Sequence, residues 1–212
     1  MGCKGYFDAV ADNWDTLRAG FFSEAVREAA CACAPLAPGQ TAADVGAGTG
    51  FVTEALVARG VGVIALDANA AMLDVLRSKP FAAGGQNLPP VDCRVCEGGS
   101  LPLPDGGVDH AFANMYLHHA DDPGAALREM ARIVRPGGRV VLTDLDLHDN
   151  AFLLREHHDR WPGFRREDVA HWLREAGLRD VRVDDAGGTC CATSACGCDS
   201  ASITIFVASG TR

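Results

Sequence analysis

A run of alternating glycines and the acid that follows it have the composition of a nucleotide-binding site. Gly46, Gly48 and Gly50 come directly after the apolar run 41–45, and Asp67 ends the next apolar run. Glycines let the backbone approach a ligand where any Cβ would collide. An acid at the end of the second strand can accept hydrogen bonds from the hydroxyls of a ribose. The order of strand, glycine turn, helix, strand and acid therefore predicts a nucleotide-binding unit.

Asp44 and the spacing of the glycines favour one of two cofactors. A dinucleotide fingerprint prefers Gly-x-Gly-x-x-Gly, whereas Gly46, Gly48 and Gly50 are each separated by one residue. The Asp44 carboxylate, two residues before Gly46, would repel a pyrophosphate but suits a ligand that carries an amine and a sulfonium. These residues resemble the first motif of class I S-adenosylmethionine (SAM) methyltransferases. A nicotinamide-dependent oxidoreductase stays the alternative, although the sequence has no Tyr-x-x-x-Lys pair. A third interpretation is a turn that only connects strand to helix.

Two later segments extend the resemblance to about residues 6–145. Glu97 lies ahead of Leu-Pro-Leu-Pro, where the family commonly has an Asp that binds the adenine amino group. Leu-His-His at 117–119, followed by Leu-Arg-Glu-Met-Ala-Arg-Ile-Val-Arg-Pro-Gly-Gly, is similar to small-molecule methyltransferases related to ubiquinone-biosynthesis C-methyltransferases, the methyltransferase type 11 family. The resemblance implies that SAM is bound, and S-adenosylhomocysteine released, by Asp44, Gly46, Ala47, Gly48, Gly50, Asp67, Ala68, Met72, Glu97, Gly98 and Asn114.

Three side chains that follow the fourth expected strand are the candidate catalytic groups: Tyr116, His118 and His119. Methyl transfer from a sulfonium depends mainly on orientation and on the exclusion of water. A base is needed only when the acceptor arrives protonated, and the pKa range of histidine suits either a base or a metal ligand. A purely structural role for the two histidines and for Tyr116 is the alternative interpretation.

Four cysteines lie within nine residues near the end of the chain: Cys190, Cys191, Cys196 and Cys198. Clustered thiols in a reducing compartment suggest a metal, metalloid or redox role rather than a disulfide framework. Their spacing is not that of a zinc finger, but four thiols can take a soft ion. Thiolate-based methylation or sensing of a metal or metalloid is therefore an alternative function, and a redox pair or an inert loop are the others. Arsenite methyltransferases carry a Cys after the fourth strand, where this chain has Met115.

Hydrophobic periodicity predicts the elements that must position these residues. Strands are expected over residues 41–45, 61–66, 91–96, 108–115, 139–144, 178–184 and 202–208. Helices are expected over residues 1–34, from 51 to a stop at 60, over 68–78, from 123 to 134, and over 166–176. The last two strands are joined without a helix, and a parallel pair would need a long crossover, so they must pair antiparallel. The predicted fold is α/β: a Rossmann-like seven-stranded sheet, mostly parallel with an antiparallel last strand, and helices on both faces.

The chain is expected to form a single methyltransferase domain over residues 1–212. Its parts are a helical N-terminal lid at 1–34, a SAM-binding core at 35–148, and a C-terminal helix and strand pair at 149–212 with a Cys-rich loop at 189–198. The family resemblance implies that the aromatic N-terminal segment, with Tyr6, Phe7 and Trp14, folds over the cofactor. The alternative is that these rings bury an amphipathic helix on the core.

Composition and charge restrict the possible partners. The chain has 212 residues, 48% of them hydrophobic, with a formal net charge of −9 and no basic cluster. Nucleic acid and anionic membranes are therefore not expected partners. No apolar run approaches the ~20 residues needed to cross a bilayer, and the N-terminus does not have the layout of a signal peptide, so a cytoplasmic location is expected. The expected partner is a small-molecule substrate, and the sequence indicates neither the acceptor nor an oligomeric state.

Overall fold

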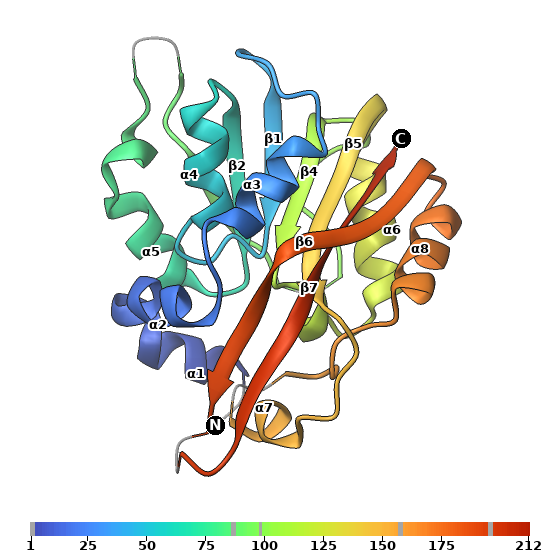
Figure 1. Cartoon of the computed structure of the whole chain (residues 1–212). Coiled ribbons are helices and arrows are strands. Elements are labelled where there is room, and N and C mark those ends of the chain that lie inside the picture. The colour runs from blue at the N-terminus through green and yellow to red at the C-terminus, as the bar shows by residue number, and fades with distance from the viewer. Residues whose placement is uncertain (1–2, 86–87, 98, 157–158, 195–196) are drawn as a thin grey trace.

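Seven strands form one sheet in the order β3-β2-β1-β4-β5-β7-β6 (Figure 1). The computed structural model describes residues 3–85, 88–97, 99–156, 159–194 and 197–212. The strands are β1 (Thr41–Val45), β2 (Gly62–Asp67), β3 (Asp92–Val95), β4 (Val108–Asn114), β5 (Val134–Leu145), β6 (Arg179–Thr193) and β7 (Ser200–Thr211). The α-helices are α1 (Cys3–Val10), α2 (Trp14–Phe21), α3 (Ala25–Ala32), α4 (Phe51–Ala58), α5 (Ala70–Ser78), α6 (Pro123–Ile133), α7 (Ala151–Glu156) and α8 (Arg166–Glu175). Three short 3₁₀ segments are η1 (Ala11–Asn13), η2 (Pro80–Ala83) and η3 (Leu117–His119).

The direction of the last strand confirms the predicted sheet. β1 pairs in parallel with β2 and β4, and the outer pairs β2–β3 and β4–β5 are parallel as well. β7 runs antiparallel to both of its neighbours, β5 and β6. The connection between β6 and β7 spans only residues 194–199, which is too short for the crossover that a parallel pair needs.

The β6–β7 pair is longer than the sequence pattern predicts. Residues 189–193, predicted to belong to a Cys-rich loop, continue β6, and Cys190 pairs with Ile203 in the ladder. Alternating small, thiol and β-branched side chains suit a strand that is buried on one side. In Figure 1 these ends of β6 and β7 extend beyond the other strands, next to α7, which periodicity did not predict. The prediction of a loop over 189–193 was therefore wrong.

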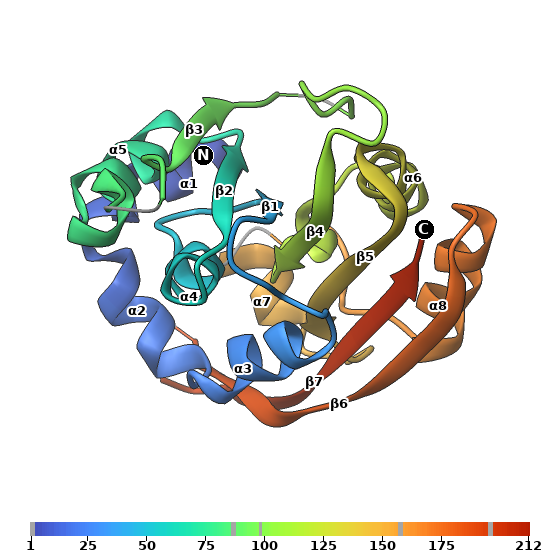
Figure 2. The same cartoon turned by 90° about the horizontal axis from the view of Figure 1, so that it is seen from above.

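Helices cover both faces of the sheet (Figure 2). α6 and α8 pack against each other and on β4, β5, β6 and β7, whereas α3, α4 and α5 contact the sheet from the other face. α5 begins at Ala70 rather than at the predicted residue 68, because the Asn69 side chain accepts a hydrogen bond from the Met72 N–H at 3.0 Å and caps the helix. In the described part of the chain, every helix is too short or too polar to span a bilayer.

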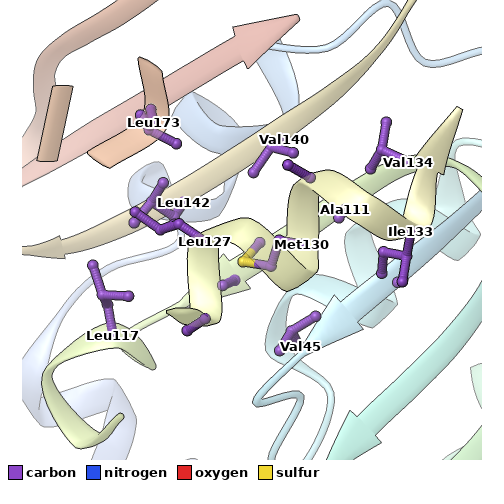
Figure 3. Packing of buried hydrophobic residues seen from close by; sticks show 14 of the residues in the cluster. Val45, Ala111, Leu117, Leu127, Met130, Ile133, Val134, Val140, Leu142 and Leu173 are labelled. Atoms are coloured by element: carbon purple, nitrogen blue, oxygen red, sulfur yellow. The ribbon is translucent and has the colours of Figure 1, made fainter. Parts of the chain in front are cut away.

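The core under α6 fixes the carboxyl ends of β4 and β5. Asp122 accepts a hydrogen bond from the Ala125 N–H at 2.9 Å and Pro123 occupies the first turn, so α6 begins where the sequence predicts. Leu127 and Met130 are fully buried and point from α6 toward Leu142 of β5 (Figure 3). This packing holds the segments that follow β4 and β5 against each other.

Leu127→Ala should lower the free energy of unfolding by about 2–5 kcal/mol, because it removes fully buried methyl groups and leaves a cavity. Urea denaturation measures the loss. Leu147→Ala is the matched control: Leu147 is 46% exposed, so its truncation should cost under about 1 kcal/mol. Equal losses for the two variants would contradict the packing described for α6.

Candidate functional site

A cavity of about 500 Å³ lies where the carboxyl ends of β1, β2, β4 and β5 meet. Ligands bind at this edge in open α/β sheets because the loops that follow parallel strands converge there. The walls are mostly apolar and come from the turn after β1, the end of β2, η3, the N-terminal helices and the far end of β6. One cavity therefore includes residues from both ends of the sequence.

The glycine turn after β1 forms one end of the cavity. Gly46, Ala47 and Gly48 line it, and the N–H groups of Gly46 and Ala47 both donate to the Leu66 carbonyl, at 2.8 and 3.0 Å. Gly46 has a φ of +70°, and a Cβ there would lie 2.6 Å from Cδ2 of Tyr116. Only glycine fits that position, because its missing side chain makes room for the Tyr116 ring.

Gly50 serves packing rather than the cavity. Its φ is +94°, and a Cβ would lie 2.9 Å from Cγ of Leu76, so α4 can approach α5 only because this residue is glycine. Gly50 does not line the main cavity. The predicted cofactor contact of Gly50 is therefore not supported, because its backbone faces the neighbouring helix.

The Asp67 carboxylate connects the glycine turn to the start of the next helix. Its Oδ2 accepts from the Gly48 N–H at 2.7 Å and its Oδ1 accepts from the Asn69 N–H at 2.8 Å. Burial raises the pKa of Asp67 above its ordinary value, against the lowering effect of these two donors. Asp67, Ala68 and Met72 line the cavity, as predicted for cofactor-binding residues.

Two predicted cofactor-binding acids lie outside the cavity lining. Asp44 is 2% exposed and accepts a hydrogen bond from Oγ1 of Thr53 at 2.6 Å, behind the glycine turn. Glu97 is exposed, whereas the preceding Cys96 lines the cavity and donates its N–H to the Asp67 carbonyl at 2.8 Å. The cavity lining therefore does not support direct ligand contacts from Asp44, whose side chain is buried, or from Glu97, which is exposed.

The remaining predicted cofactor residues are Asn114 and Gly98. Asn114 lines the cavity at the end of β4 and accepts a hydrogen bond from Oγ1 of Thr143 at 2.7 Å. The residue after it, Met115, has a φ of +51°, which is uncommon outside glycine and turns the chain sharply into η3. Gly98 lies outside the described residues.

A buried histidine–carboxylate pair forms the other end of the cavity. His118 is 5% exposed and its Nδ1 lies 2.6 Å from Oδ1 of Asp144, which is itself fully buried. Asp144 also accepts from the Leu117 N–H at 2.8 Å, so the carboxylate orients the ring and its helical turn together. Burial lowers the pKa of His118, but the charge of Asp144, its hydrogen bond to the ring and the charge of Asp159 together outweigh burial, so the net shift is upward. The Nε2 atom faces Asp159, whose Oδ1 lies 3.7 Å away.

The other two predicted catalytic side chains lie beside this pair. The ring of His119 lies 4.1 Å from that of His118, centroid to centroid, and both rings line the cavity. Tyr116 also lines the cavity, against the backbone of Gly46, and burial raises its pKa to about 12. Tyr116 is therefore protonated at neutral pH, when it can donate a hydrogen bond but cannot act as a base.

Aromatic side chains of the N-terminal helices cover the cavity. Tyr6, Phe7 and Trp14 all line it, and the Phe7 ring contacts the edges of both Trp14 and His119, at centroid distances of 5.3 and 5.4 Å. None of the three belongs to the buried core clusters of the described residues. Their position fits the predicted lid better than packing on the core, and a closing motion stays a prediction.

The described cysteines of the C-terminal cluster, Cys190, Cys191 and Cys198, have different surroundings. Cys190 lines the cavity, and burial raises the pKa of its thiol to about 12. Cys191 is exposed because successive side chains of a strand point to opposite faces. Cys198 is disulfide-bonded, and Cys196 lies outside the described residues. These surroundings do not support a site built from all four thiolates, and of the three described cysteines of the cluster Cys190 lines the cavity.

Asp144 and Asp159 are the functional candidates that the sequence analysis missed. Asp144 lies in β5, whose strand pattern was predicted, and its place at a carboxyl end is the signal that could have identified it. Asp159 follows α7 in a segment without periodicity, so no sequence pattern indicates that its carboxylate reaches His118.

Comparisons with known proteins agree with this geometry. The model of the methyltransferase domain family matches residues 43–142. The demethylmenaquinone methyltransferase of Renibacterium salmoninarum is 34% identical over 179 residues, which cover 71% of each chain. The ubiquinone biosynthesis O-methyltransferase of Pseudomonas paraeruginosa is 31% identical over 155 residues, which cover 66% of this chain and 65% of that protein. The chain spans between 31% and 71% of the length of the curated relatives that it matches.

A solved structure shows the same fold. Phosphoethanolamine N-methyltransferase 2 of Haemonchus contortus, in complex with S-adenosyl-L-methionine, superposes with a TM-score of 0.69. The match covers 88% of this chain and 52% of that one, at 15% sequence identity.

The raised pKa of Asp44 predicts how stability changes with pH. Burial, and to a smaller extent the charge of Asp67, raises this pKa from 3.8 to about 6. The folded state therefore holds the proton more tightly than the unfolded state, and the stability present below pH 4 is lost as pH rises through 6. Relative to Asp44→Asn, the wild type should lose about 3 kcal/mol over this range. Urea denaturation at several pH values measures the difference, and Asp74→Asn on the exposed side of α5 gives the background. A difference between wild type and Asp44→Asn that stays constant from pH 4 to pH 7 would contradict the prediction.

Proposed function

The chain belongs to the SAM-dependent methyltransferases, and we propose that it transfers a methyl group to a small-molecule acceptor bound beside His118. One observation carries the proposal: a single cavity joins the glycine turn and Asp67 at one end to the His118–Asp144 pair at the other. When bound, SAM supplies an electrophilic methyl group on a sulfonium. A cofactor end and an acceptor end in one cavity are what such a transfer requires.

The residues of the cofactor end fit the parts of SAM. The backbone at Gly46 and Gly48 lines the cavity without side chains, so it can accommodate the amino-acid part of the ligand. The two Asp67 oxygens already accept N–H groups and can each accept a further hydroxyl proton, which suits the ribose. Met72 and Cys96 provide apolar surface for the adenine ring. Asp44 acts through the turn that it supports rather than by contact.

The acceptor end orients its substrate and excludes water. Asp144 fixes the Nδ1 side of His118, so Nε2 is presented to the cavity. Tyr116 can donate a hydrogen bond, while the apolar wall opposite includes Leu153 and Cys190. The N-terminal rings shield this space from solvent, which favours attack on a sulfonium because water is kept from the methyl group.

We extend the proposal to the setting in which the enzyme works. The net charge of −9 and the absence of a basic cluster in the sequence support an acceptor that is neither nucleic acid nor part of an anionic membrane. Together with the lack of an apolar segment of membrane-spanning length in the sequence, these features support a cytoplasmic methyltransferase.

Isothermal titration tests the cofactor assignment. SAM and S-adenosylhomocysteine should both bind, and Asp67→Ala should weaken each by about tenfold or more, since a hydrogen bond to a charged group contributes about 1.5–3 kcal/mol. Glu97→Ala is the matched control, because the Glu97 side chain is exposed and does not line the cavity, and its affinity should equal that of the wild type. Binding of NAD without binding of SAM would overturn the assignment. A loss with Glu97→Ala equal to that with Asp67→Ala would show that the adenine end is misplaced.

A further inference from the structure

Three potential metal ligands meet at the acceptor end of the cavity. His118, His119 and Asp159 each offer one ligand atom, and these atoms all lie within 4.8 Å of one another. All three residues line the cavity. They come from two segments, η3 and the chain after α7, that are far apart in the sequence.

The backbone fixes the two segments to each other. The N–H groups of Arg160 and Trp161 both donate to the His118 carbonyl, at 3.0 and 3.1 Å, and Nε1 of Trp161 donates to the Ala120 carbonyl at 2.9 Å. Asp159 immediately precedes this double contact, so its carboxylate is positioned by the same turn that carries the histidines. The two segments that carry the three ligands are thus held together before any ion binds.

The distance between the two buried ligands suits an ion between them. Nε2 of His118 lies 3.7 Å from Oδ1 of Asp159, which is longer than a hydrogen bond. Two ligand atoms that are each about 2.1 Å from a tetrahedral ion lie about 3.4 Å apart. The observed separation is therefore close to the one that shared coordination requires.

Asp144 completes the arrangement from the other side of the His118 ring. A metal-binding histidine usually engages a carboxylate or carbonyl through its second nitrogen, which fixes the ring and raises its basicity. The contact of 2.6 Å between Nδ1 and Asp144 has this form. Asp144 is 0% exposed and Asp159 is 9% exposed, so a dication between the rings would also neutralise two buried carboxylates.

We propose that His118, His119 and Asp159 bind one divalent transition-metal ion of the zinc class. Two imidazoles and one carboxylate are the ligand set of open, catalytic-type sites, in which a further position is left for a small molecule. This step rests on the proposed function: a hydroxyl or enol oxygen of the acceptor occupies the open coordination position of the ion. Coordination lowers the pKa of that hydroxyl, so the acceptor is held as the oxyanion and its proton is released to bulk solvent as the acceptor binds, before the methyl transfer. The oxygen then forms the new O–CH₃ bond as the S–CH₃ bond of the sulfonium breaks, which leaves a neutral thioether.

Metal titration of the chelator-treated full chain tests the site without an activity assay. Wild type should bind Zn²⁺ in a one-to-one ratio by calorimetry, and Co²⁺ should give the visible absorption of a tetrahedral site that Zn²⁺ removes. Asp159→Asn and His119→Gln should each weaken Zn²⁺ binding by about tenfold or more, and Asp144→Asn by about 10–100-fold. His171→Ala is the matched control, because this exposed histidine on α8 contacts Glu175 and does not line the cavity; its Zn²⁺ affinity should be unchanged.

The cysteines supply the competing explanation, and a second variant separates it. Cys190→Ser combined with Cys191→Ser should keep Zn²⁺ affinity. Loss of Zn²⁺ binding in this cysteine variant would overturn the metal site. So would Zn²⁺ affinities of the Asp159→Asn and His119→Gln variants that equal the affinity of the wild type. The SAM affinity of the same variants, measured by titration, shows whether the cofactor end is folded. Zn²⁺ binding without SAM binding would overturn the proposed function alone, whereas SAM binding without Zn²⁺ binding would overturn only the metal site.

Discussion

The Asp67 carboxylate is the interaction on which the cofactor end of the cavity depends. It lies at the end of β2 and accepts N–H groups from Gly48, in the turn after the neighbouring strand β1, and from Asn69, at the start of α5. This carboxylate therefore helps to set the position of the glycine turn, together with the Leu66 carbonyl that accepts the N–H groups of Gly46 and Ala47. A turn built from glycines has a high conformational entropy when free, so without this anchor it would not keep an open ligand surface.

A second carboxylate positions the acceptor end of the cavity in the same way. Asp144 lies near the end of β5 and accepts N–H groups from Leu117 and His118, in the segment that follows the neighbouring strand β4. In each case an acid of one parallel strand fixes the loop that follows the neighbouring strand; Asp144 is fully buried and Asp67 is partly buried. Burying a carboxylate is costly unless several donors satisfy it, and backbone N–H groups supply them here. The sheet thus determines both halves of the cavity through two acids.

Local sequence features predicted most of the strands and the glycine turn, because each depends on periodicity or on a conformation that only glycine adopts. Asp67 and Met72 line the cavity, and their contact with a cofactor stays a prediction. The direction in which each side chain points was harder to predict from the sequence. Successive residues of an extended chain point to opposite faces, so a shift of one residue decides that Cys96 rather than Glu97 lines the cavity.

Contacts between distant segments were beyond the sequence pattern altogether. The ring of His118 meets Asp144 and Asp159, which are brought to it by strand pairing and by a turn without periodicity. The cysteines illustrate the opposite error. Their clustering in the sequence suggested a common site, but the ladder of β6 separates Cys190 from Cys191.

The N-terminal segment joins the two ends of the cavity into one environment. Asp15 accepts a hydrogen bond from Oγ1 of Thr49 at 2.6 Å, and Asp8 accepts one from Nδ2 of Asn69 at 2.9 Å, so these helices are attached to the glycine turn and to the cap of α5. The Phe7 ring meanwhile contacts His119 at the acceptor end. Because one short segment contacts both ends, a ligand that orders the turn also orders the wall against which the acceptor lies. Cofactor and acceptor would then share a cover, and water would be excluded from both by the same helices.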